Sequence, residues 1–70
     1  MNANDFNVEE INLIGAVFAN TREQTIENIY QVLPDITDNA VKKIAENAIT
    51  KLERMGNEEF VACDFLSLQA

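Results

Sequence analysis

The chain has 70 residues, of which 47% are hydrophobic, and it carries 12 acidic residues against 5 basic ones. This length suits one domain spanning residues 1–70, and the apolar fraction is typical of globular rather than disordered proteins. The net charge of −7 repels nucleic-acid phosphates and favours a positively charged partner. The same charge could instead serve only to keep a small protein soluble.

Neither a membrane segment nor an export signal is expected. The first ten residues lack the basic and apolar regions of a signal peptide. The most apolar run, residues 11–19, has nine residues, whereas a helix needs about 20 to cross a bilayer. Cys63 is the single cysteine, so we expect a packed, reduced thiol. These features predict a cytoplasmic protein without membrane contact.

The first helix is expected to begin after Asn7, which can cap it while Glu10 bonds back in a capping box. Phe6 and Ile11 occupy the positions of a hydrophobic staple. Apolar side chains cover most of the circumference, which predicts that this helix is central in the core. They are Val8, Ile11, Leu13, Ile14, Val17 and Phe18.

The second helix is expected to begin after Thr21, with Gln24 completing another capping box, and to end before Pro34. Its apolar residues recur at helical spacing. They are Ile26, Ile29, Tyr30 and Leu33.

A turn over residues 34–37 leads to the third helix, for which we predict Thr37 as the cap because Ile36 and Val41 would then form a staple. The helix is expected to reach about Met55. Its apolar stripe is Val41, Ile44, Ala45, Ala48, Leu52 and Met55.

The break at Gly56 is predicted to join two helices rather than to form a functional loop. Gly56 stands where a glycine often ends a helix, and Asn57 can cap a short fourth helix. The apolar contacts of that helix are expected from Phe60, Val61, Phe65, Leu66 and Leu68. No segment alternates like a strand, so the fold class is all-α: a small bundle of three helices plus a short C-terminal fourth helix.

The sequence offers no catalytic, cofactor-binding or metal-binding residues. It contains no histidine, the commonest general base and metal ligand. Residues 35–46 resemble a calcium loop in the spacing of their oxygen-bearing side chains, but Ala40 replaces the glycine of the sharp turn and Lys43 takes the ninth position. We therefore predict a protein that is not an enzyme and has no cofactor.

Charge placement on the third helix suggests an interaction surface. The segment from Asp38 to Met55 contains three acidic and four basic residues, so its net charge is +1 and that of the remainder is −8. Lys43, Lys51 and Arg54 fall on one flank of the helix. This flank is either a solvated face with internal ion pairs, or a surface that meets an acidic patch on a second copy, a partner, or DNA held in a larger complex.

Four stretches resemble a known family: FNVEEINLI, TREQTIENI, LP and KKIAENAITKLERMGNEEFVACDF. The chain resembles the transposon-transfer assisting proteins, small proteins encoded on conjugative transposons of Gram-positive bacteria. The similarity covers roughly Phe6 to Leu66 and is firmest in KLERMGNEEF. It implies a helical accessory protein for excision or transfer of the element, without catalysis of its own. It supplies no active-site residues.

Three hypotheses of function follow. The leading one is an acidic helical module that binds another element-encoded protein, a basic one such as a relaxase or DNA-processing factor. The alternative is direct nucleic-acid binding through Lys43, Lys51 and Arg54. An enzyme is the third and least supported. A homodimer is also expected, because the core is small and the first helix is apolar over most of its surface.

Overall fold

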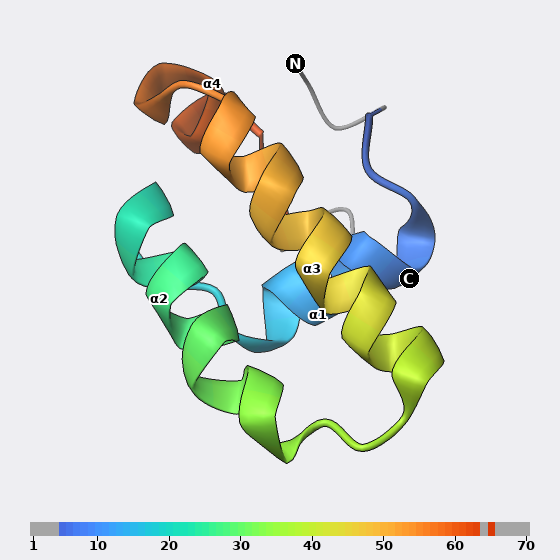
Figure 1. Ribbon diagram of the computed structural model, residues 1–70. Coiled ribbons are helices and arrows are strands. Elements are labelled where there is room, and N and C mark those ends of the chain that lie inside the picture. The colour runs from blue at the N-terminus through green and yellow to red at the C-terminus, as the bar shows by residue number, and fades with distance from the viewer. Residues whose placement is uncertain (1–4, 64, 66–70) are drawn as a thin grey trace.

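The computed structural model describes residues 5–63 and 65, and within these residues it is helical with no strand. The predicted all-α fold, three helices and a short fourth, is confirmed (Figure 1). The elements are α1 (Val8–Ala16), α2 (Arg22–Val32), the short 3-10 helix η2 (Leu33–Asp35), α3 (Asn39–Arg54) and α4 (Asn57–Ala62).

The longest helix, α3, organises the bundle. It packs against both α1 and α2, and α1 passes behind it in Figure 1. The prediction that the first helix is central is therefore wrong. The error has a local cause, which is the length of α1. The helix ends at Ala16, so Val17 and Phe18 follow it instead of extending its apolar surface, and Val8 is exposed.

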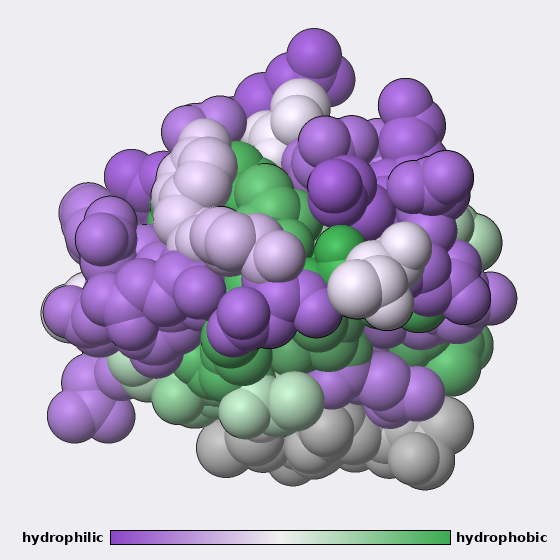
Figure 2. Space-filling view, turned by 60° about the horizontal axis from the view of Figure 1, so that its bottom comes forward, coloured by the Kyte–Doolittle hydropathy of each residue, from purple (hydrophilic) through white to green (hydrophobic). Residues whose placement is uncertain are grey.

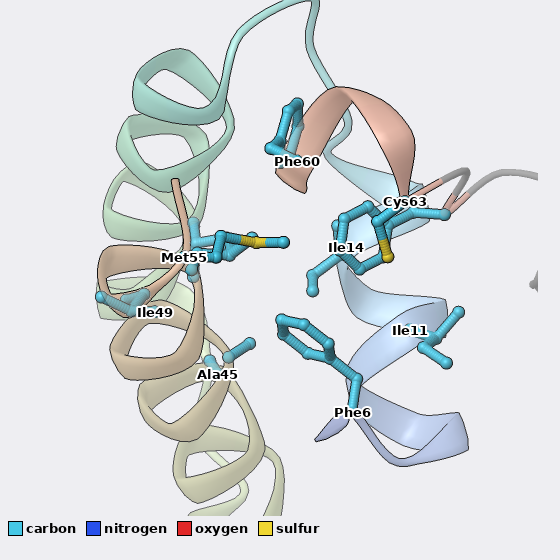
Figure 3. Packing of buried hydrophobic residues seen from close by; sticks show 12 residues of the cluster. Phe6, Ile11, Ile14, Ala45, Ile49, Met55, Phe60 and Cys63 are labelled. Atoms are coloured by element: carbon cyan, nitrogen blue, oxygen red, sulfur yellow. The ribbon is translucent and has the colours of Figure 1, made fainter. Parts of the chain in front are cut away.

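The core is a cluster of buried side chains to which all four α-helices contribute. Phe6, Ile14 and Met55 approach one another from the two sides of the α1–α3 contact (Figure 3). Aromatic pairs close the end of the core that lies next to α4. Phe6 meets Phe65 edge-on with ring centroids 5.2 Å apart, and Phe18 stacks on Phe60 at 5.5 Å. Such pairs add about 0.5–1.5 kcal/mol beyond the area they bury.

Most, but not all, of the predicted apolar residues lie in this core or pack against it. Ile29 is fully buried, whereas Tyr30 and Val41 are exposed. Conversely, Ile49 is buried although it lies off the stripe predicted for the third helix. Because α3 contacts helices on two sides, its buried face is wider than one stripe.

The starts of α1 and α2 follow the predicted caps. The Asn7 side chain accepts from the Glu10 backbone at 2.8 Å and the Glu10 carboxylate accepts from the Asn7 backbone at 2.9 Å, so the capping box is confirmed. Thr21 caps α2 by accepting from the Gln24 backbone at 3.1 Å. The second capping box is wrong: the Thr21 side chain caps α2 without a return bond to Gln24, whose amide donates to Asn28 at 3.0 Å.

The start of α3 lies one residue later than predicted. Asp38, not Thr37, is the cap, and its carboxylate accepts from the backbone of Ala40 at 2.8 Å and of Val41 at 3.4 Å. A carboxylate brings a full negative charge to the positive end of the helix dipole. The shift puts Val41 at the third helical position, so the predicted staple with Ile36 does not form.

The joint between α3 and α4 is where it was predicted, but its geometry differs. Gly56 has φ −82° and ψ 164°, an extended conformation open to any residue, so it is not a left-handed helix terminator. It is itself the cap residue of α4, its backbone donating to the Glu59 carboxylate at 2.8 Å. Asn57 is the first residue of the helix, and its predicted capping role is wrong.

Helix α4 turns Phe60 inward. Phe60 and Phe65 are buried as predicted, and Cys63 is packed in the core. Val61 was predicted to pack and does not: it is 77% exposed. The predicted contacts of Leu66 and Leu68 lie outside the described residues.

Candidate interaction surface

The three residues of the predicted interaction surface differ in their surroundings. Lys51 donates to the Glu10 carboxylate with Nζ 2.6 Å from Oε1, and the side chains are 28% and 2% exposed respectively. The same Glu10 oxygen accepts the Asn7 backbone in the α1 capping box. Lys51 Nζ also lies 5.7 Å from the centroid of the Phe6 ring, within range of a cation–π contact.

Lys43 and Arg54 are exposed. The flank therefore presents two of its three charges to solvent, while the third neutralises a buried carboxylate between α1 and α3. An interaction at Lys43, Lys51 and Arg54 stays a prediction, and Lys51 has an internal partner that any ligand would have to replace.

Arg22 is a contact residue that sequence reasoning missed. Its Nε donates to the Asn57 side chain at 2.8 Å, its Nη1 to the Leu52 carbonyl at 3.0 Å, and its Nη2 lies 3.5 Å from the Glu23 carboxylate. One guanidinium thus joins the start of α2 to the end of α3 and the start of α4. The only signal in the sequence is a lone basic residue in an acidic stretch, and this does not reveal its partners.

The surface that remains is strongly anionic. In the described part of the chain nine acidic residues are exposed against three basic ones. Hydrophilic side chains cover most of the face shown in Figure 2, with apolar ones visible between them. The exposed acidic residues are Asp5, Glu9, Glu23, Glu27, Asp35, Asp38, Glu46, Glu53 and Glu58, and the exposed basic ones are Lys42, Lys43 and Arg54.

Two adjoining hollows lie along α4: the described lining of the larger belongs to α4, and the smaller lies between α4 and the start of α2. We call them together the α2–α4 groove. The larger has a volume of about 390 Å³ and is lined by Asn57, Glu58, Val61 and Ala62. The smaller, about 160 Å³, shares Asn57 and Val61 and adds Asn20, Thr21, Arg22, Glu23 and Phe60.

The described residues do not assemble a metal centre. Across residues 5–63 and 65, no three histidine, cysteine, aspartate or glutamate side chains are grouped so that they could hold an ion. The last two thirds of the calcium-like stretch, from Asn39 to Glu46, are part of α3. In the same part of the chain, no helix has the length and apolar character needed to cross a membrane.

Comparison with protein families decides the affiliation of the chain. The model of the family described as "Putative transposon-transfer assisting protein" matches residues 6–67. The chain belongs to this family. The resemblance of the segment from Phe6 to Leu66 is thereby confirmed. No curated protein and no solved structure matched the chain.

Membership in the transposon-transfer assisting proteins agrees with the geometry in one respect. Residues 51–60, where we expect the resemblance to be firmest, contain Lys51 and Leu52, which contact α1 and Arg22, and the joint that orients α4. These contacts hold the fold together. The family name indicates assistance in transposon transfer and specifies no partner.

Proposed function

We propose that this transposon-transfer assisting protein is a non-catalytic, acidic helical module that binds a basic protein encoded on the same conjugative transposon. The observation that carries the proposal is the imbalance of exposed charge among the described residues, nine carboxylates against three cations. The exposed acids outnumber the exposed bases three to one, in part because Lys51 and Arg22 direct their charges to partners within the molecule.

Such a surface acts on association before contact is made. An anionic field attracts a basic partner and raises the rate of encounter, and salt screens this attraction over about 8–10 Å at ordinary ionic strength. The proposed complex should therefore be sensitive to salt.

Two observations support the non-catalytic part of the proposal. The family is named for an assisting role, and the sequence has no histidine to act as a general base near neutral pH. The adjacent acidic pairs at the starts of α1 and α4 have structural roles, since Glu10 and Glu59 each accept the backbone of a cap residue.

The test has two stages. The tagged protein is first used to capture partners at low salt from cells that carry the transposon, and the captured protein is then purified. Its affinity is measured for the wild type, for a Glu27→Gln, Glu46→Gln, Glu53→Gln variant, and for a Lys42→Gln, Lys43→Gln control. All five side chains are exposed.

We expect the acidic-residue variant to bind about tenfold more weakly at low salt, from roughly 0.5 kcal/mol for each surface charge. The control should bind at least as well as the wild type, because it removes positive charge. Equal affinities of all three proteins, or capture of no transposon-encoded protein, would count against the proposal.

Direct nucleic-acid binding is a second candidate, supported by the exposure of Lys43 and Arg54 on one flank of α3. Gel-shift assays at about 50 mM salt would detect it, since phosphate contacts strengthen steeply as salt is lowered. A shift that a Lys43→Gln, Arg54→Gln variant abolishes would support this candidate. The absence of any shift at that salt concentration would remove it.

A further inference from the structure

We propose that the α2–α4 groove docks a short segment of the partner in which one apolar residue is flanked by lysines or arginines. This inference deepens the proposed function and rests on it for the existence of a basic partner. It adds the place of contact and the chemistry of the segment.

The apolar element of the groove is Val61. It is 77% exposed, although its neighbour Phe60 is buried. Its side chain lines both hollows, and Ala62 beside it is also exposed. Binding sites commonly combine a concave apolar surface with a few polar groups around it, which is what Val61, Ala62 and the adjacent Asn57 provide.

The walls of the groove are held in place by Arg22. Its bonds to Asn57 in α4 and to the Leu52 carbonyl in α3, at 2.8 and 3.0 Å, fix the first turn of α2 against α4 and the end of α3. Because these contacts are made within the molecule, the groove exists before any ligand arrives. A preformed site loses less conformational freedom on binding than one that must be assembled.

The charge around the groove selects the occupant. Glu58 lines the larger hollow and Glu23 the smaller one. Arg22 is the basic residue of the lining, but its side chain is 19% exposed against 61% for that of Glu23, so the groove presents mainly carboxylates to solvent. A second copy of this chain would bring a net charge of −7 against this rim, whereas a basic segment complements it.

The probe is a capped five-residue peptide with leucine between two pairs of lysines, titrated into the labelled protein and followed by backbone amide NMR. A peptide with serine in place of leucine tests the apolar anchor, and one with glutamates in place of the lysines tests the charge. Val61→Ser and Glu58→Gln are the groove variants. Val41→Ser is the matched control, because Val41 is an exposed valine in the first turn of α3, at the opposite end of that helix from α4.

We expect the leucine peptide to shift the amides of Glu23, Asn57 and Val61 selectively. Val61→Ser should weaken its binding at least fivefold, Glu58→Gln about twofold, and Val41→Ser not measurably. The serine and glutamate peptides should bind at least fivefold more weakly than the leucine peptide.

Equal binding of the leucine and serine peptides, or amide shifts spread over the whole acidic surface, would refute the groove as the docking site. Neither result would contradict the proposal that the protein is an acidic module that binds a basic partner. Wild-type self-association in sedimentation that Val61→Ser abolishes would also overturn it, since the occupant would then be a second copy. Conversely, selective peptide binding together with failure to capture a transposon-encoded protein would refute the proposed function and leave the groove standing as a basic-peptide site.

Discussion

Glu10 shows how much one residue does beyond what its position in the sequence indicates. As the third residue of α1 it completes a capping box, which the sequence predicts. It is also buried and bound to Lys51, 41 residues later. A buried carboxylate without a cationic partner is costly. The stability of the first turn of α1 therefore depends on Lys51, near the end of α3.

Replacing Lys51 with alanine should therefore destabilise the protein. Complete burial of an unpaired charge costs about 3–5 kcal/mol. Since water reaches the 28% exposed Lys51 side chain, we expect about 2 kcal/mol, measured as the loss in free energy of unfolding by urea denaturation. Lys43→Ala is the control, and as an exposed substitution it should change stability by less than about 0.5 kcal/mol.

A second variant separates the charge from the hydrogen bond. Glu10→Gln keeps an oxygen that can accept the Asn7 backbone and leaves no buried anion, so it should cost less than Lys51→Ala. If Lys51→Ala and Lys43→Ala cost the same, the pair contributes nothing to stability.

At the scale of the elements, caps set the boundaries and packing chooses among competing caps. Thr37 and Asp38 are both good cap residues, and the sequence pattern alone favoured Thr37 through an apolar staple. In the structure α3 begins at Asn39 and Asp38 accepts two backbone donors. The staple was a misleading signal because Val41 is exposed.

These two assignments make different predictions. Asp38→Ala should lower the free energy of unfolding by about 1 kcal/mol, the usual contribution of a cap side chain. Thr37→Ala should leave it within about 0.5 kcal/mol. Thermal or urea unfolding of both variants measures the difference, and the reverse order would restore Thr37 as the cap.

The geometry of the joint at Gly56 predicts that a substitution there raises the free energy of unfolding. Its extended backbone suits any residue, and a Cβ added there would lie 3.5 Å from the Glu59 carboxylate, an ordinary contact. Gly56→Ser should stabilise the protein by about 0.5–1 kcal/mol, because it restricts the unfolded chain and offers α4 a side-chain cap.

A glycine in the left-handed conformation would respond in the opposite way, since substitution there adds strain. The change in urea midpoint at constant slope is the measurement. A destabilised Gly56→Ser protein would contradict the extended geometry of the joint.

At the scale of the whole molecule, the fold class followed from periodicity and caps, while the long-range contacts did not. The capping box of α1, the cap of α2 and the position of the α3–α4 joint are local patterns, which the sequence shows directly. Lys51–Glu10 and Arg22–Asn57 join residues 41 and 35 positions apart. They depend on how the helices cross, and a local pattern does not specify this.

The same reason explains what the sequence revealed of the candidate surface. It predicted the shared flank of Lys43, Lys51 and Arg54, because flanks follow from helical spacing. It could not predict that Lys51 turns to α1, or that Val61 stays exposed while Phe60 is buried. Both outcomes depend on neighbours from other helices.

Self-association is the remaining prediction at this scale. Each copy carries a charge of −7, so repulsion opposes a dimer at low ionic strength and screening relieves it. We expect the dimer fraction in sedimentation velocity to rise between about 50 mM and about 500 mM salt. Monomers alone at both salt concentrations and at high protein concentration would contradict a homodimer.

The Arg22 contacts couple α4, the shortest of the α-helices in the described residues, to the rest of the molecule. A helix of six residues is too short to persist in isolation, so α4 depends on its attachment to the first turn of α2 and the end of α3. Fraying of that turn would release α4 and erase the α2–α4 groove in the same event. By mass action, any ligand held there would slow amide hydrogen exchange in both helices together.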